Sequence, residues 1–125
     1  MEIHACFLLN ILSSSSQPTK EHLTHFLYYS IFCNKMDLSL TAGNQVSSDC
    51  LKSISSTFID CEGDLLINNV ESVCRHLLAE TKTFSSRVHF VLDNAGLEFF
   101  SDICLSIYLL QTGLASDIVF HVKVL

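Results

Sequence analysis

Hydrophobic residues in the last forty positions follow two alternating patterns. Residues 88–92 form an almost continuous apolar run with polar residues on both sides, which predicts a strand buried on both faces. Apolar residues from Leu97 to Gln111 recur at helical spacing, and Gly113 then suits the end of a helix. Residues 117–124 return to a strand pattern. A strand, a helix and a strand within about 35 residues predict a right-handed βαβ unit with parallel strands.

The first part of the chain predicts helices. Residues 1–12 are mostly apolar but lack the basic start of a secretory signal and are too short to cross a bilayer, which favours a buried helix. Residues 20–33 have helical spacing behind Thr19, a suitable N-terminal cap. Residues 69–80 repeat this arrangement behind Asn68. We therefore expect three helices ahead of the βαβ unit.

The segments between these helices contain turn-forming residues. Residues 13–20 are predicted to form a loop, and residues 34–40 are expected to leave the helix with a turn or cap at Asp37 or Ser39. Residues 41–56 are rich in Ser, Asn, Thr and Gly, which is typical of a surface loop. Residues 65–67, Leu-Leu-Ile, are predicted to form a short strand.

Composition and charge narrow the class of protein. The chain has 125 residues, 49% hydrophobic and 16% charged, which is typical of one globular domain. Its net charge is −6 with no cluster of Lys and Arg, so we expect no nucleic-acid partner. We also expect no membrane partner, and a location in the cytoplasm with the nucleus as a second compartment. An acidic protein would need a cation to bind a phosphate.

Cysteines and histidines are the soft and borderline metal ligands that this sequence offers. The six cysteines form no C-x-x-C pair and match no zinc spacing, so we expect free thiols in a reducing compartment. His22 and His25 lie three residues apart on a predicted helix and could share a ligand. Packing or surface roles are favoured for both, because no third ligand is nearby.

Asp93 and Asn94 are the main candidates for chemistry. They follow the first strand of the βαβ unit, at the end where open parallel sheets bind ligands. Their carboxylate and amide oxygens suit Mg²⁺ or Mn²⁺, and Gly96 permits a tight turn into a helix whose free N–H groups favour a phosphate. A capping Asp and a turn-forming Asn are equally consistent with the pattern. Glu98 and Asp102 share one helix face and are more often solvated acids that complement the helix dipole.

Two motifs resemble the damage-control phosphatase family. The first is residues 87–102, Arg-Val-His-Phe-Val-Leu-Asp-Asn-Ala-Gly-Leu-Glu-Phe-Phe-Ser-Asp, which is similar to the strand-D-N-x-G-x-E-helix signature of that family. The second is residues 34–40, similar to a G-N-x-x-D-L-S segment, with Cys33 where Gly is usual. The most similar subgroup is the eukaryotic sugar-phosphate phosphatases, also described as acidic-residue (protein-glutamate) methyltransferase-like proteins. The resemblance extends over residues 32–123.

The resemblance implies a fold, a reaction and a set of site residues. The fold is a three-layer α/β/α domain, and the reaction is metal-dependent hydrolysis of small sugar phosphates such as fructose 1-phosphate and fructose 6-phosphate. The metal is Mn²⁺ or Ni²⁺, with Mg²⁺ as a further choice. Asp93 and Asn94 match the metal ligands and catalytic residues. The implied substrate contacts are the same pair with Glu98, Asn34 and Asp37.

The family pattern also contains parts that this sequence does not match. A further Asp ligand after the second strand, a later substrate-binding stretch and an R-T-x-K motif are missing. We therefore expect a helical segment over residues 1–31 and a partial α/β domain over residues 32–125, inactive and poorly stable alone. Alternatives are a non-catalytic piece with a binding or regulatory role, and a protein-glutamate methyltransferase. The latter is disfavoured because no Gly-rich loop follows a strand.

Overall fold

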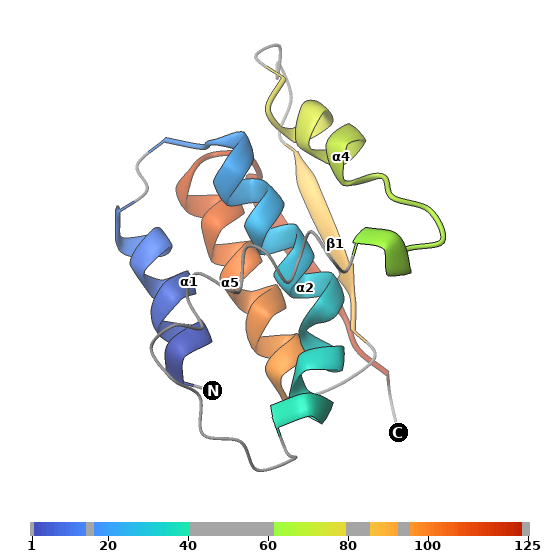
Figure 1. Cartoon of the computed structure of the whole chain (residues 1–125). Helices are drawn as coiled ribbons and strands as arrows, with labels where there is room; N and C mark the ends of the chain where they lie inside the picture. Colours follow the sequence, from blue (N-terminus) through green and yellow to red (C-terminus); the bar gives the residue numbers. More distant parts are fainter. Residues whose placement is uncertain (1, 15–16, 41–61, 80–85, 93–95, 124–125) are drawn as a thin grey trace.

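A computed structural model describes residues 2–14, 17–40, 62–79, 86–92 and 96–123 (Figure 1). Of residues 2–7, 34–40 and 62, it describes the backbone alone. The elements, in chain order, are α1 (Glu2–Ser14), α2 (Lys20–Leu40), the 3₁₀-helix η1 (Glu62–Asp64), α4 (Val70–Leu77), β1 (Arg87–Val91), α5 (Leu97–Gln111) and β2 (Asp117–His121). None of these described helices has the length and apolar character needed to cross a membrane.

The predicted βαβ unit is confirmed. Strands β1 and β2 pair in parallel, from Arg87 opposite Asp117 to Val91 opposite His121, and α5 connects them. Gly113 ends α5 with a φ of 70°, which explains the preference for glycine there. The chain is therefore an α/β protein, with α2 and α5 side by side on one side of the two strands (Figure 1).

The prediction that the first strand is buried on both faces is wrong for the described part of the chain. Residues along β1 alternate, with Val88 and Phe90 packed against the core and Val91 84% exposed. The core-facing residues of β1 lie on the face of the sheet that α5 covers. No described element covers the other face of β1. An apolar residue on a strand reports strand propensity, but only the packing partner decides burial.

Helix α2 is longer than predicted. Thr19 caps it as expected, since the His22 N–H donates to Thr19 Oγ1 at 3.1 Å. Residues 34–40, which were expected to leave the helix, instead continue it to Leu40. This segment contains no Gly or Pro, and its Lys, Met and Leu residues favour helix over a turn. Helix α2 thus continues without a break across residues 31 and 32. The predicted division into a helical segment at 1–31 and an α/β domain at 32–125 stays a prediction.

The predictions for the helix after Asn68 and for a strand at residues 65–67 had different outcomes. Helix α4 forms as predicted, but it begins at Val70, and its N-cap residue is Asn69, whose side chain makes no capping hydrogen bond. Asn68, the predicted cap, lies one residue earlier, and its Oδ1 accepts the Val70 N–H at 3.0 Å. Residues 65–67 do not form a strand, and Leu66 and Ile67 are exposed. A three-residue apolar run cannot complete its backbone hydrogen bonds without a neighbouring strand. The loop predicted at 41–56 lies outside the described residues.

The core lies between α2 and α5. Tyr108 is fully buried there and packs on Phe26, with ring centroids 4.7 Å apart. Its hydroxyl accepts the Thr19 N–H at 3.1 Å and donates to the Thr19 carbonyl at 3.3 Å. Helix α1 adds Leu8 and Ile11 to this core, which confirms the buried helix predicted for the first residues.

Candidate active site

The candidate site begins where the chain leaves β1 and enters α5. Gly96 has φ 89° and ψ −137°, a conformation that essentially only glycine adopts. Its carbonyl accepts the Phe100 N–H at 3.0 Å, the first hydrogen bond of α5. Asp93 and Asn94, the predicted metal ligands, lie outside the described residues. The backbone of Gly96 thus has the special conformation that the predicted tight turn requires.

Helices α2 and α5 run antiparallel, so the last turns of α2 lie beside the first turns of α5 (Figure 1). At one end of the pair Thr19 contacts Tyr108, and towards the other end Ser30 donates a hydrogen bond to Asp102. Residue numbers therefore rise along α2 as they fall along α5. The backbone of the final turns of α2 therefore lies beside the start of α5.

Asn34 and Asp37, the predicted substrate contacts, lie in the last two turns of α2. Only their backbone is described. That backbone is on the same side of the sheet as α5 (Figure 1). A site shared by these residues with Asp93 stays a prediction, and the arrangement of the two helices is compatible with it.

Asp102 is a buried acid between α5 and α2. It is 7% exposed, and its Oδ1 accepts a hydrogen bond from Ser30 Oγ at 2.5 Å. Burial raises the pKa of this carboxyl, the hydrogen bond from Ser30 opposes that shift, and the charge of Glu98 adds to it. The expectation of a solvated helix acid is wrong for Asp102, because α2 packs over this face of α5.

Glu98 lies in the first turn of α5. It is half-buried, and its carbonyl accepts a hydrogen bond from Ser101 Oγ at 2.7 Å. A carboxylate at this position complements the partial positive charge of the helix start. The negative charge of Glu98 also raises the pKa of the Asp102 carboxyl. Its role as a substrate contact stays a prediction.

Three of the six cysteines have described side chains. Cys33, Cys74 and Cys104 are buried free thiols, as predicted. Burial raises the pKa of the Cys33 thiol to about 11, although its hydrogen bond with Ser101 acts in the opposite direction. Burial also raises the pKa of Cys104. Thiols that resist ionisation are poor nucleophiles, so we assign Cys33 and Cys104 to packing.

The family model of the damage-control phosphatase ARMT1-like domain matches residues 4–125. The chain belongs to this family. It is 36% identical over 119 residues to "Damage-control phosphatase ARMT1" of Xenopus tropicalis, covering 91% of this chain and 27% of that protein. The mouse protein of the same name is 32% identical over 123 residues, with coverage of 96% and 28%. The chain therefore spans about a quarter of the length of these curated relatives. No solved structure matches it.

Membership of the ARMT1-like family directs attention to possible metal ligands. Among the residues with described side chains, no group of three or more His, Cys, Asp or Glu is arranged around a common point. His22 and His25 have different surroundings: His25 Nδ1 lies 2.8 Å from the Glu21 carbonyl, and the His22 ring meets Tyr108 edge-on. These contacts of His22 and His25 agree with the favoured packing or surface roles.

Sequence reasoning missed another histidine pair in this ARMT1-like chain. His89 on β1 and His121 on β2 contact each other, although they are 32 residues apart. A parallel register would have predicted their contact, but the alignment of the two strands cannot be read from either strand alone. The helical spacing of His22 and His25 was the stronger local pattern and it led to no site.

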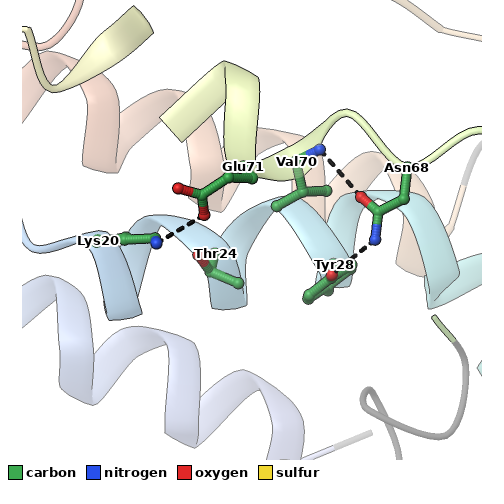
Figure 2. Close-up of a pocket in the computed structure, with 6 residues that line it drawn as sticks. All are labelled: Lys20, Thr24, Tyr28, Asn68, Val70 and Glu71. Carbon is green, nitrogen blue, oxygen red and sulfur yellow. Dashed lines mark hydrogen bonds and ion pairs between the residues drawn. The ribbon is translucent and has the colours of Figure 1, made fainter. Parts of the chain in front are cut away.

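A cleft of about 310 Å³ lies between α2 and α4 (Figure 2). It is lined by Lys20, Thr24, Tyr28, Asn68, Val70 and Glu71. Lys20 Nζ lies 2.6 Å from Glu71 Oε2, and Asn68 Nδ2 donates to the Tyr28 hydroxyl at 3.2 Å. These polar groups tie α4 to the first half of α2, far from the start of α5. We interpret the cleft as the seam along which α4 docks.

Proposed function

We propose that this chain provides part of the active site of a metal-dependent phosphatase for small sugar phosphates. Fructose 1-phosphate and fructose 6-phosphate are the first candidates. The observation that supports the proposal most is the sequence position of Asp93-Asn94 in an ARMT1-like chain, in the short segment between β1 and Gly96, the N-cap residue of α5. Ligands of open α/β sheets bind beyond this end of the strands.

The donor atoms of Asp93 and Asn94 fit a hard divalent cation. A carboxylate and an amide oxygen are ligands for Mn²⁺ and Mg²⁺, and Ni²⁺ is the other metal we propose. Such an ion, when bound, would polarise a phosphoryl oxygen and lower the pKa of a bound water. Asp93 and Asn94 would hold the ion, and they are also our candidates for contact with the transferred phosphoryl group.

The start of α5 suits the phosphate group of a substrate. The first hydrogen bond of α5 uses the Phe100 N–H, so the N–H groups of residues 97–99 precede any acceptor within the helix. These groups and the helix dipole favour an anion. Glu98, Asn34 and Asp37 supply polar groups for the sugar hydroxyls in this proposal. We expect this reaction to take place in the cytoplasm.

A chimera tests the proposal, because this chain corresponds to about a quarter of each relative. Residues 4–125 would replace the matching segment of the Xenopus tropicalis relative, and phosphate release from fructose 1-phosphate would be measured with Mn²⁺. We expect turnover that Asp93→Asn removes. Glu71→Gln, in the α2–α4 cleft, is the matched control and should retain it.

The results separate the candidate functions. Equal turnover in the Asp93→Asn chimera would contradict the phosphatase proposal. A chimera that folds but releases no phosphate under any of the three metals would favour the non-catalytic alternative. The 125-residue chain assayed alone tests the separate expectation that it is inactive.

A further inference from the structure

Two histidines meet on the exposed face of the sheet. Nδ1 of His89 lies 2.8 Å from Nε2 of His121. The ring centroids are 5.1 Å apart and the ring planes differ by 21°. Because the centroids are farther apart than the facing nitrogens by about one ring width, the rings meet edge to edge. Each nitrogen is therefore directed at the other in a hydrogen bond whose donor depends on the tautomers of the two rings.

The strand register creates this pair. His89 lies opposite Val119, two residues before His121, so both imidazoles project from the same face of the sheet. Both are exposed. On the same face, Arg87 and Asp117 form an ion pair at 2.6 Å, so these neighbouring charges already balance each other. Among the described residues of β1 and β2, these two histidines are the side chains on this face with imidazole nitrogens that can bind a metal.

We propose that His89 and His121 form a second metal site, which binds Ni²⁺ or Cu²⁺ in preference to Zn²⁺ and does not bind Mg²⁺. The ion would lie between the two facing nitrogens in place of the hydrogen-bonding proton, which moves to the far nitrogen of the donor ring, and water would complete the coordination. Neutral imidazole is a ligand of borderline ions, whereas Mg²⁺ and Mn²⁺ prefer oxygen. This donor set therefore selects a different class of ion from the Asp93-Asn94 oxygens.

The geometry explains the order of preference. With metal–nitrogen bonds of about 2.05 Å, nitrogens 2.8 Å apart subtend an angle of about 86° at the ion. That angle suits adjacent positions of a square-planar or octahedral ion, as Cu²⁺ and Ni²⁺ prefer. A tetrahedral Zn²⁺ would need the nitrogens to open to about 3.3 Å. Each exposed ring also has to turn so that its nitrogen points at the ion, which solvent-facing side chains permit.

The site lies on the face of the sheet away from α5. Val88 and Phe90 point to the core, and His89 between them points outwards. An ion held by His89 and His121 would link β1 to β2 four residues before Asp93. The second site would therefore stabilise the strand that leads into the candidate active site. It does not depend on the proposed phosphatase activity.

Ni²⁺ titration of the 125-residue chain tests the proposal, with calorimetry for affinity and circular dichroism for folding. We expect saturable binding that His89→Ala and His121→Ala each weaken at least about tenfold. His76→Ala, an exposed histidine on α4, is the matched control and should leave this binding unchanged. Mg²⁺ should give no corresponding event. With Cu²⁺, electron paramagnetic resonance should show two coupled nitrogens, reduced to one in either variant.

Asp93→Asn separates this site from the proposed catalytic metal. Ni²⁺ binding that persists in Asp93→Asn and is lost in His121→Ala would support two sites. Loss in Asp93→Asn with full retention in His89→Ala and His121→Ala would overturn the proposal, as would the absence of saturable Ni²⁺ binding. If His121→Ala does not fold, His121→Gln removes the imidazole but keeps a polar side chain, and the same comparison applies. Failure of the phosphatase assay would leave this result unaffected.

Discussion

At the scale of single residues, the backbone conformation at Gly96 requires glycine. Its φ of 89° and ψ of −137° are accessible essentially only to glycine. We predict that Gly96→Ala lowers the free energy of unfolding by about 1–3 kcal/mol, measured by urea denaturation. Gly63→Ala is the control, because an added methyl group there meets nothing within 4 Å. Equal stability of the two variants would show that the chain does not require glycine at this turn.

Asp102 leads to a second prediction at the residue scale, concerning pH. Its pKa is raised in the folded protein, so the folded state holds this proton more tightly than the unfolded state. The contribution of Asp102 to stability is therefore present below the ordinary carboxyl pKa and falls as pH rises through the folded-state pKa. Asp102→Asn should remove this fall while keeping an acceptor for Ser30. Unfolding curves measured across the acidic range test it, with Asp64→Asn on η1 as the control; an unchanged pH profile in Asp102→Asn would contradict it.

At the scale of elements, the α2–α5 pair holds most of the core. Tyr108 connects the two helices through its ring, which packs on Phe26, and through its hydroxyl, which bonds to the Thr19 backbone. We predict that Tyr108→Phe costs about 1–2 kcal/mol of unfolding free energy by removing the hydroxyl. Tyr108→Ala should cost about 3–5 kcal/mol, because it also leaves a cavity. Similar losses in the two variants, in thermal or urea unfolding, would show that the ring contributes little.

At the scale of the whole molecule, the described part of the sheet has two strands and one open face. Val91 and Val122 are exposed apolar residues at the end of this sheet. Open strand edges and apolar surface promote association between chains. We predict concentration-dependent self-association of the 125-residue chain, reduced by Val91→Thr. Light scattering across a concentration series measures it. Ile67→Thr, an exposed residue outside the sheet, is the control, and an equal effect of both changes would exclude the sheet as the contact.

The parts of the fold that depend on neighbours in the chain could be predicted from the sequence. Helical spacing and a cap at Thr19 indicated α2, and the order of apolar patterns indicated the parallel βαβ unit. Gly96 and Gly113 marked turns that need positive φ. The D-N-x-G motif consists of neighbouring residues, so the family could also be predicted from the sequence. All of these features rest on interactions over a few positions, which local patterns of residue type describe well.

Other features required the packed structure, because they join residues far apart in the chain. The sequence predicted a solvated Asp102, whereas Ser30, 72 residues away in the chain, donates a hydrogen bond to its carboxylate. His89 and His121 became a pair only through the register of two strands. Apolar residues on β1 looked buried on both faces, yet the described helices cover one. Burial and long-range pairing are properties of the surfaces that meet when elements pack, and the pattern of each element alone leaves its partner unspecified.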